Sequence, residues 1–231
     1  MSVIKERIAT TADEELSNHW QRYEFAKKYI KNKNVVSIAC GSGYGEFYLA
    51  TEGQSKSVLG IDSSGEAIAN AKKNYQAKNL TFKQIDALKN NIDSQSFDVI
   101  ISFETIEHIN DDNKLLEEFL RILKTDGILI LSTPNKASSF KNLLAKPTIN
   151  PYHVREYRKI ELECLLKKYF KSVSFFGQRT IFKRSFLRLP LYFIYKFSGW
   201  LRKIEIADNV VNQYPSKNNL EMCTFVVVCK K

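Results

Sequence analysis

The stretch VVSIACGSGYGEFYLA, residues 35–50, decides the fold of this chain. It opens with a short β-branched run, passes through glycines at positions 41, 43 and 45, and ends in a segment suited to a helix. Glycines between a buried strand and a helix let the backbone approach a ligand closely, and the amino end of the helix favours a polar or anionic group. The stretch therefore predicts a ligand-binding turn in an α/β protein.

Two common nucleotide-binding motifs do not fit this turn. A dinucleotide fingerprint, G-x-G-x-x-G, would need a glycine at position 46, which is Glu46. A phosphate-binding Walker loop would need Gly-Lys-Ser or Gly-Lys-Thr, and neither follows. The turn therefore predicts a cofactor other than a dinucleotide or a nucleoside triphosphate.

Short apolar runs elsewhere predict further buried strands. The predicted strands cover residues 35–39, 58–61, 80–84, 97–103, 128–132, 172–177 and 221–231. Helical patterns lie between them, at residues 45–52, 65–77, 111–123 and 155–169. This alternation predicts a doubly wound, mostly parallel sheet with helices on both faces.

Two carboxylates follow predicted strands. Asp62 ends the run SVLGID, 21 residues after Gly41, and a carboxylate at that position can accept hydrogens from both hydroxyls of a ribose. Asp86 lies in IDAL, residues 85–88, where an Asx turn or a helix cap is the alternative to a ligand contact.

Taken together, several motifs resemble class I S-adenosylmethionine (SAM)-dependent methyltransferases, and within them a bacterial subgroup associated with surface-polysaccharide synthesis. The motifs are G-x-G-x-G with Asp62, WQRYEFAKKYIKN (20–32), FETIEHI (103–109), LSTPN (131–135) and NPYHVREY (150–157), and the likeness covers roughly residues 19–178. The resemblance implies a Rossmann-like fold, a seven-stranded sheet with an antiparallel last strand, and SAM as cofactor. The cofactor contacts that it implies are Ala39, Gly41, Ser42, Gly43, Asp62, Ser63, Asp86, Ala87 and Phe103.

The chain departs from the family pattern at two positions of the first strand and its turn. The usual acidic residue is Ser37, and the usual first glycine is Ala39. Because a serine carries no charge, the end of the site that takes the cofactor's ammonium group needs another acceptor, for which a backbone carbonyl is one option.

Methyl transfer from a sulfonium needs mainly alignment of the reacting atoms, but a hydroxyl acceptor also needs a base. Candidate bases are His108, His153 and Glu104, with capping, substrate contact or packing as alternatives for the histidines. Tyr152 and Arg155 are candidate contacts to the acceptor.

No metal site is predicted from the sequence. The acidic pair Asp111 and Asp112 precedes a predicted helix, whose positive end favours carboxylates, so both are interpreted as caps. The four cysteines, at positions 40, 164, 223 and 229, lack paired spacing and are predicted to be reduced thiols.

The excess of positive charge lies in the last third of the chain. Residues 151–231 hold 16 Lys and Arg against six Asp and Glu, which accounts for the net charge of +10. Residues 179–203 contain seven basic and no acidic side chains, interleaved with aromatic ones. A lid over the acceptor, an interface and a peripheral membrane contact all fit this segment; an RNA-binding module is not recognised in it.

We expect one domain, residues 1–231, with a helical segment at 1–33 and an insertion at 180–214 before the last strand. The absence of a visible export signal predicts a cytoplasmic protein, with peripheral contact at the inner membrane through residues 180–203 as an option. The predicted function is methylation of a sugar hydroxyl or an anionic group of a surface-polysaccharide or glycolipid precursor. The alternatives are a small metabolite or quinone-like acceptor, and a non-catalytic SAM- or RNA-binding scaffold.

Overall fold

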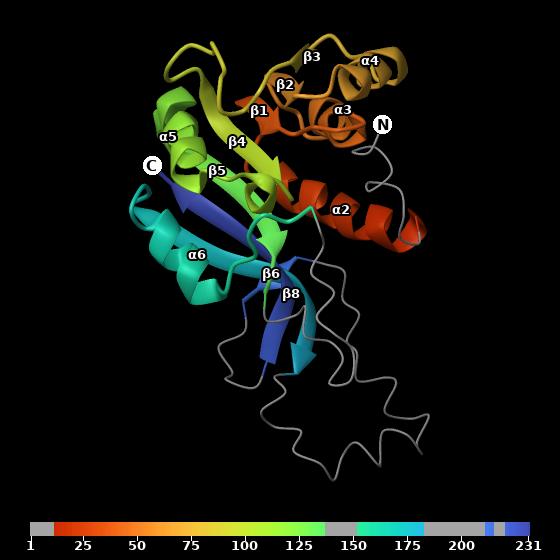
Figure 1. Cartoon of the computed structure of the whole chain (residues 1–231). Helices are drawn as coiled ribbons and strands as arrows, with labels where there is room; N and C mark the ends of the chain where they lie inside the picture. Colours follow the sequence, from red (N-terminus) through yellow and green to blue (C-terminus); the bar gives the residue numbers. More distant parts are fainter. Residues whose placement is uncertain (1–11, 137–151, 183–210, 215–219) are drawn as a thin grey trace.

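A computed structural model describes residues 12–136, 152–182, 211–214 and 220–231 (Figure 1). Its strands are β1 (Asn34–Ile38), β2 (Ser57–Asp62), β3 (Leu80–Gln84), β4 (Phe97–Phe103), β5 (Leu123–Pro134), β6 (Ser172–Phe182), β7 (Asn212–Gln213) and β8 (Leu220–Lys230). Its helices are α2 (Ala12–Lys27), α3 (Tyr44–Thr51), α4 (Gly65–Asn74), the 3-10 turn η1 (Ile106–His108), α5 (Asp112–Ile122) and α6 (Lys159–Leu166).

The strands form one sheet in the order β3-β2-β1-β4-β5-β8-β6-β7. Strands β1 to β5 pair in parallel. The last strand, β8, is antiparallel to both β5 and β6, which confirms the predicted α/β architecture with an antiparallel final strand. Because parallel strands point the same way, the turns after β1, β2, β4 and β5 meet at one edge of the sheet.

The predicted strand number of seven is wrong, because the sheet has eight strands. The additional strand, β7, is only two residues long and pairs with Phe176 and Gly177 of β6. A two-residue strand is too short to show hydrophobic alternation, so it lies unnoticed within the segment predicted as an insertion. The same segment also overlaps β6, which continues to Phe182.

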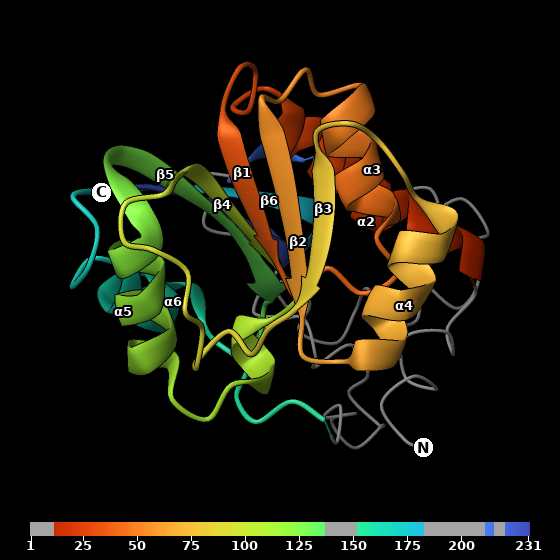
Figure 2. The ribbon, with the colours of Figure 1, turned by 90° about the horizontal axis from the view of Figure 1, so that it is seen from above.

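Helices cover both faces of the sheet (Figure 2). One face packs against α5 and α6, with Leu116, Phe119 and Leu162 in its core. The opposite face packs against α2 and α3 through Tyr23, Ala26 and Leu49, while α4 covers β3 on that same side. Alternation of side chains along each strand explains the two cores, because neighbouring residues point to opposite faces.

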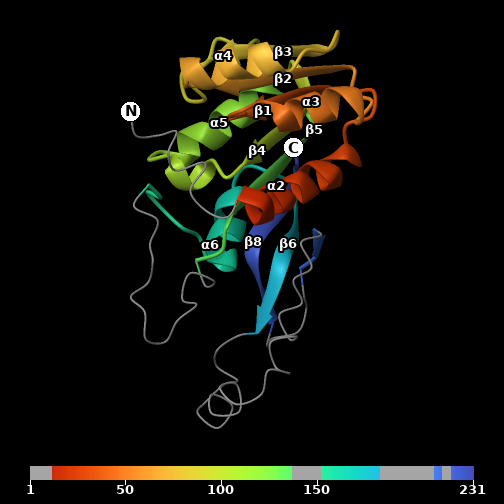
Figure 3. The same ribbon diagram turned by 90° about the vertical axis from the view of Figure 1, so that its right-hand side faces the viewer.

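Helix α2 lies across the sheet face that carries α3 (Figure 3). It falls within the segment predicted to be helical, and the ring of Phe25 packs 4.9 Å from that of Phe176 on β6. Of the other predicted helices, α3 is shifted by one residue and α4, α5 and α6 are shorter than predicted. The largest difference is α6, predicted from residue 155, which starts at Lys159.

The central part of the basic segment, residues 183–210, lies outside the described residues, so its predicted roles as lid, interface or membrane contact stay predictions. Within the described part of the chain, every helix is too short or too polar to cross a membrane. The four cysteines all lie in the described residues and none is in a disulfide; Cys164 is exposed and the other three are buried.

Candidate active site

The turn after β1 adopts the left-handed conformation at alternate residues. Ala39, Gly41 and Gly43 have φ values of 57°, 56° and 85°. A Cβ on Gly43 would lie 2.7 Å from the Cβ of Ala71 and 2.8 Å from the ring of Phe82, so only glycine lets α4 and β3 support the turn this closely. Ala39 stands where the family has glycine, and its positive φ costs on the order of 1 kcal/mol. The turn is therefore tightly held and locally strained.

Asp62 joins this turn to the one after β2. Its side chain is buried, and its Oδ2 and Oδ1 each accept a backbone N–H at 2.9 Å, from Gly41 and Ser64 respectively. These two bonds place the carboxylate between the two turns, the position predicted to take the ribose hydroxyls. The other predicted contacts on the two turns, Ser42 and Ser63, are exposed.

Replacement of Asp62 by asparagine is expected to lower SAM affinity by about 10- to 100-fold, because an amide has one acceptor oxygen and loses charge-assisted bonds worth roughly 1.5–3 kcal/mol. Titration calorimetry with SAM and with S-adenosylhomocysteine measures this change. Asp126→Asn, a change at an exposed position, serves as the control. An unchanged affinity in the Asp62 variant would show that the carboxylate holds the turns and not the ribose.

A buried carboxylate, that of Glu46, lies next to Ser37, the position at which related sequences usually have an acid. The Ser37 hydroxyl donates a hydrogen bond of 2.6 Å to Oε1 of Glu46, and the hydroxyl of Tyr23 donates to the same oxygen at 3.4 Å. Glu46 is fully buried, and its Oε2 is without a hydrogen-bond partner among the described residues. Burial raises the pKa of Glu46 to about 7, although the bond from Ser37 opposes this. A carboxylate therefore lies beside Ser37, but it comes from α3 and not from β1.

Helix α2 covers the glycine turn with Arg22 and Tyr23. A Cβ on Gly45 would lie 2.0 Å from the Tyr23 ring, and that ring meets Phe103 edge-on at 5.2 Å. Arg22 is buried, donates to Gln178 at 2.7 Å, and forms an ion pair of 3.0 Å with Glu104. Phe103, a predicted cofactor contact, therefore belongs to an aromatic wall beside the turn.

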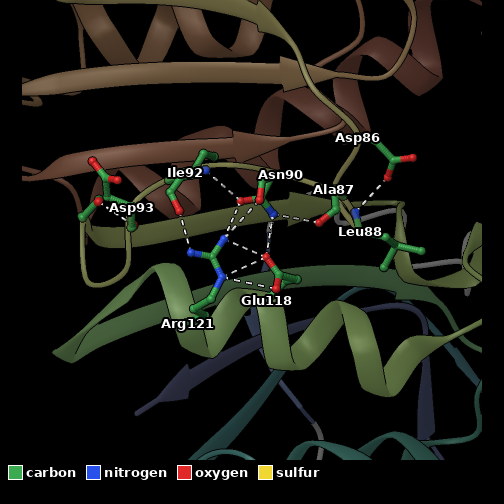
Figure 4. A network of polar contacts seen from close by, with 9 residues as sticks. Asp86, Ala87, Leu88, Asn90, Ile92, Asp93, Glu118 and Arg121 are labelled. Carbon is green, nitrogen blue, oxygen red and sulfur yellow. Dashed lines mark hydrogen bonds and ion pairs between the residues drawn. The ribbon is translucent and has the colours of Figure 1, made fainter.

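The loop after β3 is attached to α5 by a polar network (Figure 4). Arg121 donates to Asn90 and Glu118 at 2.8 Å each, and Asn90 donates to the carbonyl of Ala87 at 3.0 Å. Asp86 is exposed, and its Oδ1 accepts the N–H of Leu88 at 2.8 Å, which is the Asx turn considered above. The network holds this loop in place; adenine contacts by Asp86 and Ala87 stay predictions.

His108 and His153 lie side by side, as their places in the sequence suggest. The carbonyl of Glu107 accepts the N–H groups of Val154 at 2.8 Å and Arg155 at 3.1 Å, which fastens the later segment to η1. The two imidazole rings are 5.0 Å apart and nearly perpendicular. Two of the three candidate bases thus form one cluster, and backbone hydrogen bonds hold it.

The third candidate base, Glu104, lies next to that cluster. It follows β4 with a positive φ of 48° and accepts a hydrogen bond of 2.7 Å from Ser132. Burial is the largest influence on the pKa of Glu104 and acts to raise it, but Arg22, His19, the hydrogen bond from Ser132 and His153 together outweigh burial and hold the pKa below its ordinary value. A carboxylate with a lowered pKa is a weaker base, which favours the histidines for proton removal.

The predicted acceptor contacts differ in how they are held. Tyr152 is 46% exposed, whereas Arg155 forms an ion pair of 3.0 Å with Asp112 and stacks over the ring of Tyr157. Asp111 caps α5 by accepting the N–H of Lys114 at 3.0 Å, as predicted. Asp112 is instead an anchor for residues 155–157, since it also accepts the Tyr157 hydroxyl at 2.9 Å.

Sequence analysis misses four residues of the site: Arg22, Tyr23, Glu46 and Glu107. Glu107 has a signal of its own, since it lies between Glu104 and His108 in the stretch already singled out. Arg22 and Tyr23 lie in a segment that shows only helical character. Glu46 was used solely to reject the dinucleotide motif, although an acid inside a buried helix turn is itself unusual.

A parallel sheet with a glycine turn after β1 and a carboxylate at the end of β2 defines an α/β protein that binds a cofactor at the carboxyl edge of the sheet. Residues 30–176 match the family model described as a methyltransferase domain, so the chain belongs to this family of SAM-dependent methyltransferases. Methyl transfer is the reaction of this family, and S-adenosylmethionine is its cofactor. The glycine-constrained turn and the buried, unpartnered carboxylate oxygen of Glu46 fit a cofactor that carries an ammonium group.

Known proteins agree on the fold and the reaction class. A probable SAM-dependent methyltransferase of Mycobacterium tuberculosis is 30% identical over 162 residues, which cover 68% of this chain but only 57% of that relative. A ubiquinone biosynthesis O-methyltransferase of Pelagibacter ubique is 34% identical over 113 residues, 47% of this chain and 45% of its own length. The crystal structure of a SAM-dependent methyltransferase from Thermotoga maritima superimposes with a TM-score of 0.63 at 19% identity, covering both chains fully, and so supports the fold.

Proposed function

We propose that this chain transfers the methyl group of SAM to a hydroxyl oxygen. The observation that carries the proposal is the pair of histidines at the carboxyl edge of the sheet, beside the turn that follows β4. An N- or C-methyltransferase acting on a strong nucleophile has less need of such a pair, whereas a hydroxyl must lose its proton as its oxygen attacks the methyl carbon.

His108 is oriented for this task. Its Nδ1 lies 3.0 Å from the carbonyl oxygen of Tyr152, and a carbonyl can only accept, so Nδ1 carries the hydrogen in the neutral ring. Nε2 is then the basic nitrogen. SAM supplies an activated methyl on a sulfonium, and the residues of this chain have only to align the acceptor and take its proton.

On the cofactor side, Asp62 is proposed to hold the ribose, and Glu46 to accept the ammonium group of the methionine part. Glu46 suits this role because its buried Oε2 has no other partner in the described structure. An ammonium there would pair with a carboxylate whose raised pKa reflects the cost of being charged without a counter-ion.

As acceptor we propose a sugar hydroxyl, or an anionic sugar chain of the kind found in surface-polysaccharide or glycolipid precursors. The support is the family resemblance of the motifs around the two histidines and the excess of basic residues after position 150. A quinone-like phenol is the second candidate, since relatives named ubiquinone biosynthesis O-methyltransferases match this chain. The match to one from Coxiella burnetii covers 86% of this chain and 75% of the relative.

The proposal is tested by incubating purified protein and radiolabelled SAM with lipid-linked glycans and, separately, with catechol-type phenols. We expect label on the glycan, recovered as a methyl ether of a sugar after the glycan is hydrolysed. The variant His108→Gln should lower kcat by roughly 100-fold while SAM affinity is retained. Label on phenols alone would select the second candidate. Label on nitrogen or carbon would reject O-methylation.

A further inference from the structure

We propose that Glu107, His108 and His153 bind one divalent metal ion. Each offers a ligand atom, and these atoms all lie within 4.8 Å of one another. One carboxylate oxygen and two imidazole nitrogens are a donor set that suits Zn²⁺, Mn²⁺, Fe²⁺ or Co²⁺ better than Mg²⁺ or Ca²⁺, which prefer oxygen ligands.

The surroundings of the two histidines resemble the outer shell of a metal centre. A metal-bound histidine usually gives its second ring N–H to a carbonyl or carboxylate, which orients the ring. Here Nδ1 of His108 lies 3.0 Å from the Tyr152 carbonyl oxygen, and Nδ1 of His153 lies 3.1 Å from Oε1 of Glu156. A carbonyl thus orients the ring of His108 and a carboxylate orients the ring of His153, each through Nδ1.

An independent observation comes from Glu107. Its side chain is fully buried, Oε2 accepts a hydrogen bond of 2.9 Å from Thr133, and Oε1 has no partner in the described structure. A buried carboxylate oxygen without a donor is costly unless something positive meets it. Glu104, which acts on Glu107 electrostatically, is also negative, and Arg22 already pairs with Glu104. A cation between Glu107 and the imidazoles satisfies this oxygen.

The backbone makes the cluster rigid enough for such a role. The two N–H groups donated to the Glu107 carbonyl, from Val154 and Arg155, fix the segment of His153 relative to η1. Three protein ligands leave coordination positions open. If the proposed function holds, an open position would take the acceptor's hydroxyl oxygen and so align it. With the ion bound, Nε2 of His108 would be a ligand and not the base, and the ion itself would favour loss of the hydroxyl proton. The binding of the metal does not depend on that function.

Titration of the chelator-treated full chain with Co²⁺ and, by calorimetry, with Zn²⁺ and Mn²⁺ tests the proposal. We expect one ion per chain and visible Co²⁺ absorption that Zn²⁺ abolishes. Glu107→Gln and His153→Ala should each weaken binding at least tenfold, whereas Glu117→Gln, a matched change of an exposed glutamate on α5, should not. Thermal unfolding of the metal-free variants checks that they fold.

Two outcomes would overturn the inference: no stoichiometric binding of any of the three ions, or binding that the Glu107 and His153 variants retain. The proposed function is separable from it. Hydroxyl methylation that persists after complete chelation leaves O-methylation standing and rejects an aligning role for the ion, whereas the titrations alone decide whether the site binds metal. Stoichiometric binding without methylation of any hydroxyl acceptor leaves the metal site standing and rejects O-methylation.

Discussion

Replacing Arg22 with methionine is expected to lower the free energy of unfolding by about 3–5 kcal/mol, because it leaves one member of a buried ion pair without its partner. The Arg22 side chain is 5% exposed and that of Glu104 is 23% exposed. The change also leaves the Gln178 oxygen without its 2.7 Å donor. Denaturant unfolding of the purified variant, followed by circular dichroism, measures the loss.

The double variant Arg22→Met/Glu104→Gln provides the control for this prediction. It removes both charges, so most of the lost stability should return, since a buried ion pair is worth little compared with a neutral pair of similar shape. If the double variant is no more stable than Arg22→Met, the loss comes from packing of α2 and not from the stranded charge. A loss below about 1 kcal/mol in the single variant would place the pair in the weak class of exposed ion pairs.

Changing Glu46 to glutamine is expected to stabilise the fold at alkaline pH and to weaken cofactor binding. The pKa of Glu46 is about 7 in the folded protein against 4.5 as its ordinary value. The folded state therefore holds this proton more tightly than the unfolded chain. The resulting stability is fully present below pH 4.5 and is lost as pH rises through 7. Glutamine cannot ionise, so the variant keeps this stability at alkaline pH.

The free energy of unfolding of the variant, measured relative to that of the wild type, should therefore rise by about 3 kcal/mol between pH 4.5 and pH 8, as expected for a pKa shift of this size. Unfolding measured for both proteins across that range gives the result, because every other titrating group cancels in the comparison. A stability difference that does not change with pH would mean that Glu46 ionises as easily in the folded protein as in the unfolded chain.

Cofactor binding supplies the second part of the Glu46 prediction. S-adenosylhomocysteine should bind Glu46→Gln at least tenfold more weakly, whereas methylthioadenosine, which lacks the amino acid part, should bind both proteins alike. Exchange of the two partners, Ser37→Glu with Glu46→Ser, returns the acid to β1 and should restore the affinity. Equal weakening for both ligands would assign Glu46 a role in the shape of the turn instead.

Stability and binding thus oppose each other at this carboxylate. A buried acid whose Oε2 has no partner among the described residues lowers the stability of the free protein above neutral pH, and in the proposed function the same oxygen would pair with the cofactor's ammonium group. Such opposition is common at functional sites, where residues suited to a ligand are kept at some cost to the fold.

Much of the fold follows from local patterns. Strands β1 to β6 and β8 were predicted within a few residues at most ends, since buried parallel strands are short runs of apolar, β-branched residues. The boundary between α5 and β5 was less predictable. Leu123 continues the helical spacing of apolar residues but begins the strand, because it pairs with Phe97 of β4.

The glycine turn and Asp62 were also predictable, because each occupies a place that the order of strands defines. The ends of parallel strands come together whatever the loops do, so Asp62 had to approach Gly41, and the observed bond of 2.9 Å follows. His108 and His153 each follow a strand that ends at this edge and are both candidate bases from the sequence, but their ring contact is found only in the structure.

What the sequence by itself determined is the architecture, the cofactor turn and the class of reaction, because these depend on periodicity and on residues near one another in the chain. The tertiary structure alone decided that Glu46 lies beside Ser37, that Arg22 pairs with Glu104, and that Glu107 lies with the two histidines. Each of these contacts depends on how a helix or loop packs on the finished sheet. The bond from Arg22 to Gln178 spans 156 residues, and no local pattern encodes a distance of that kind.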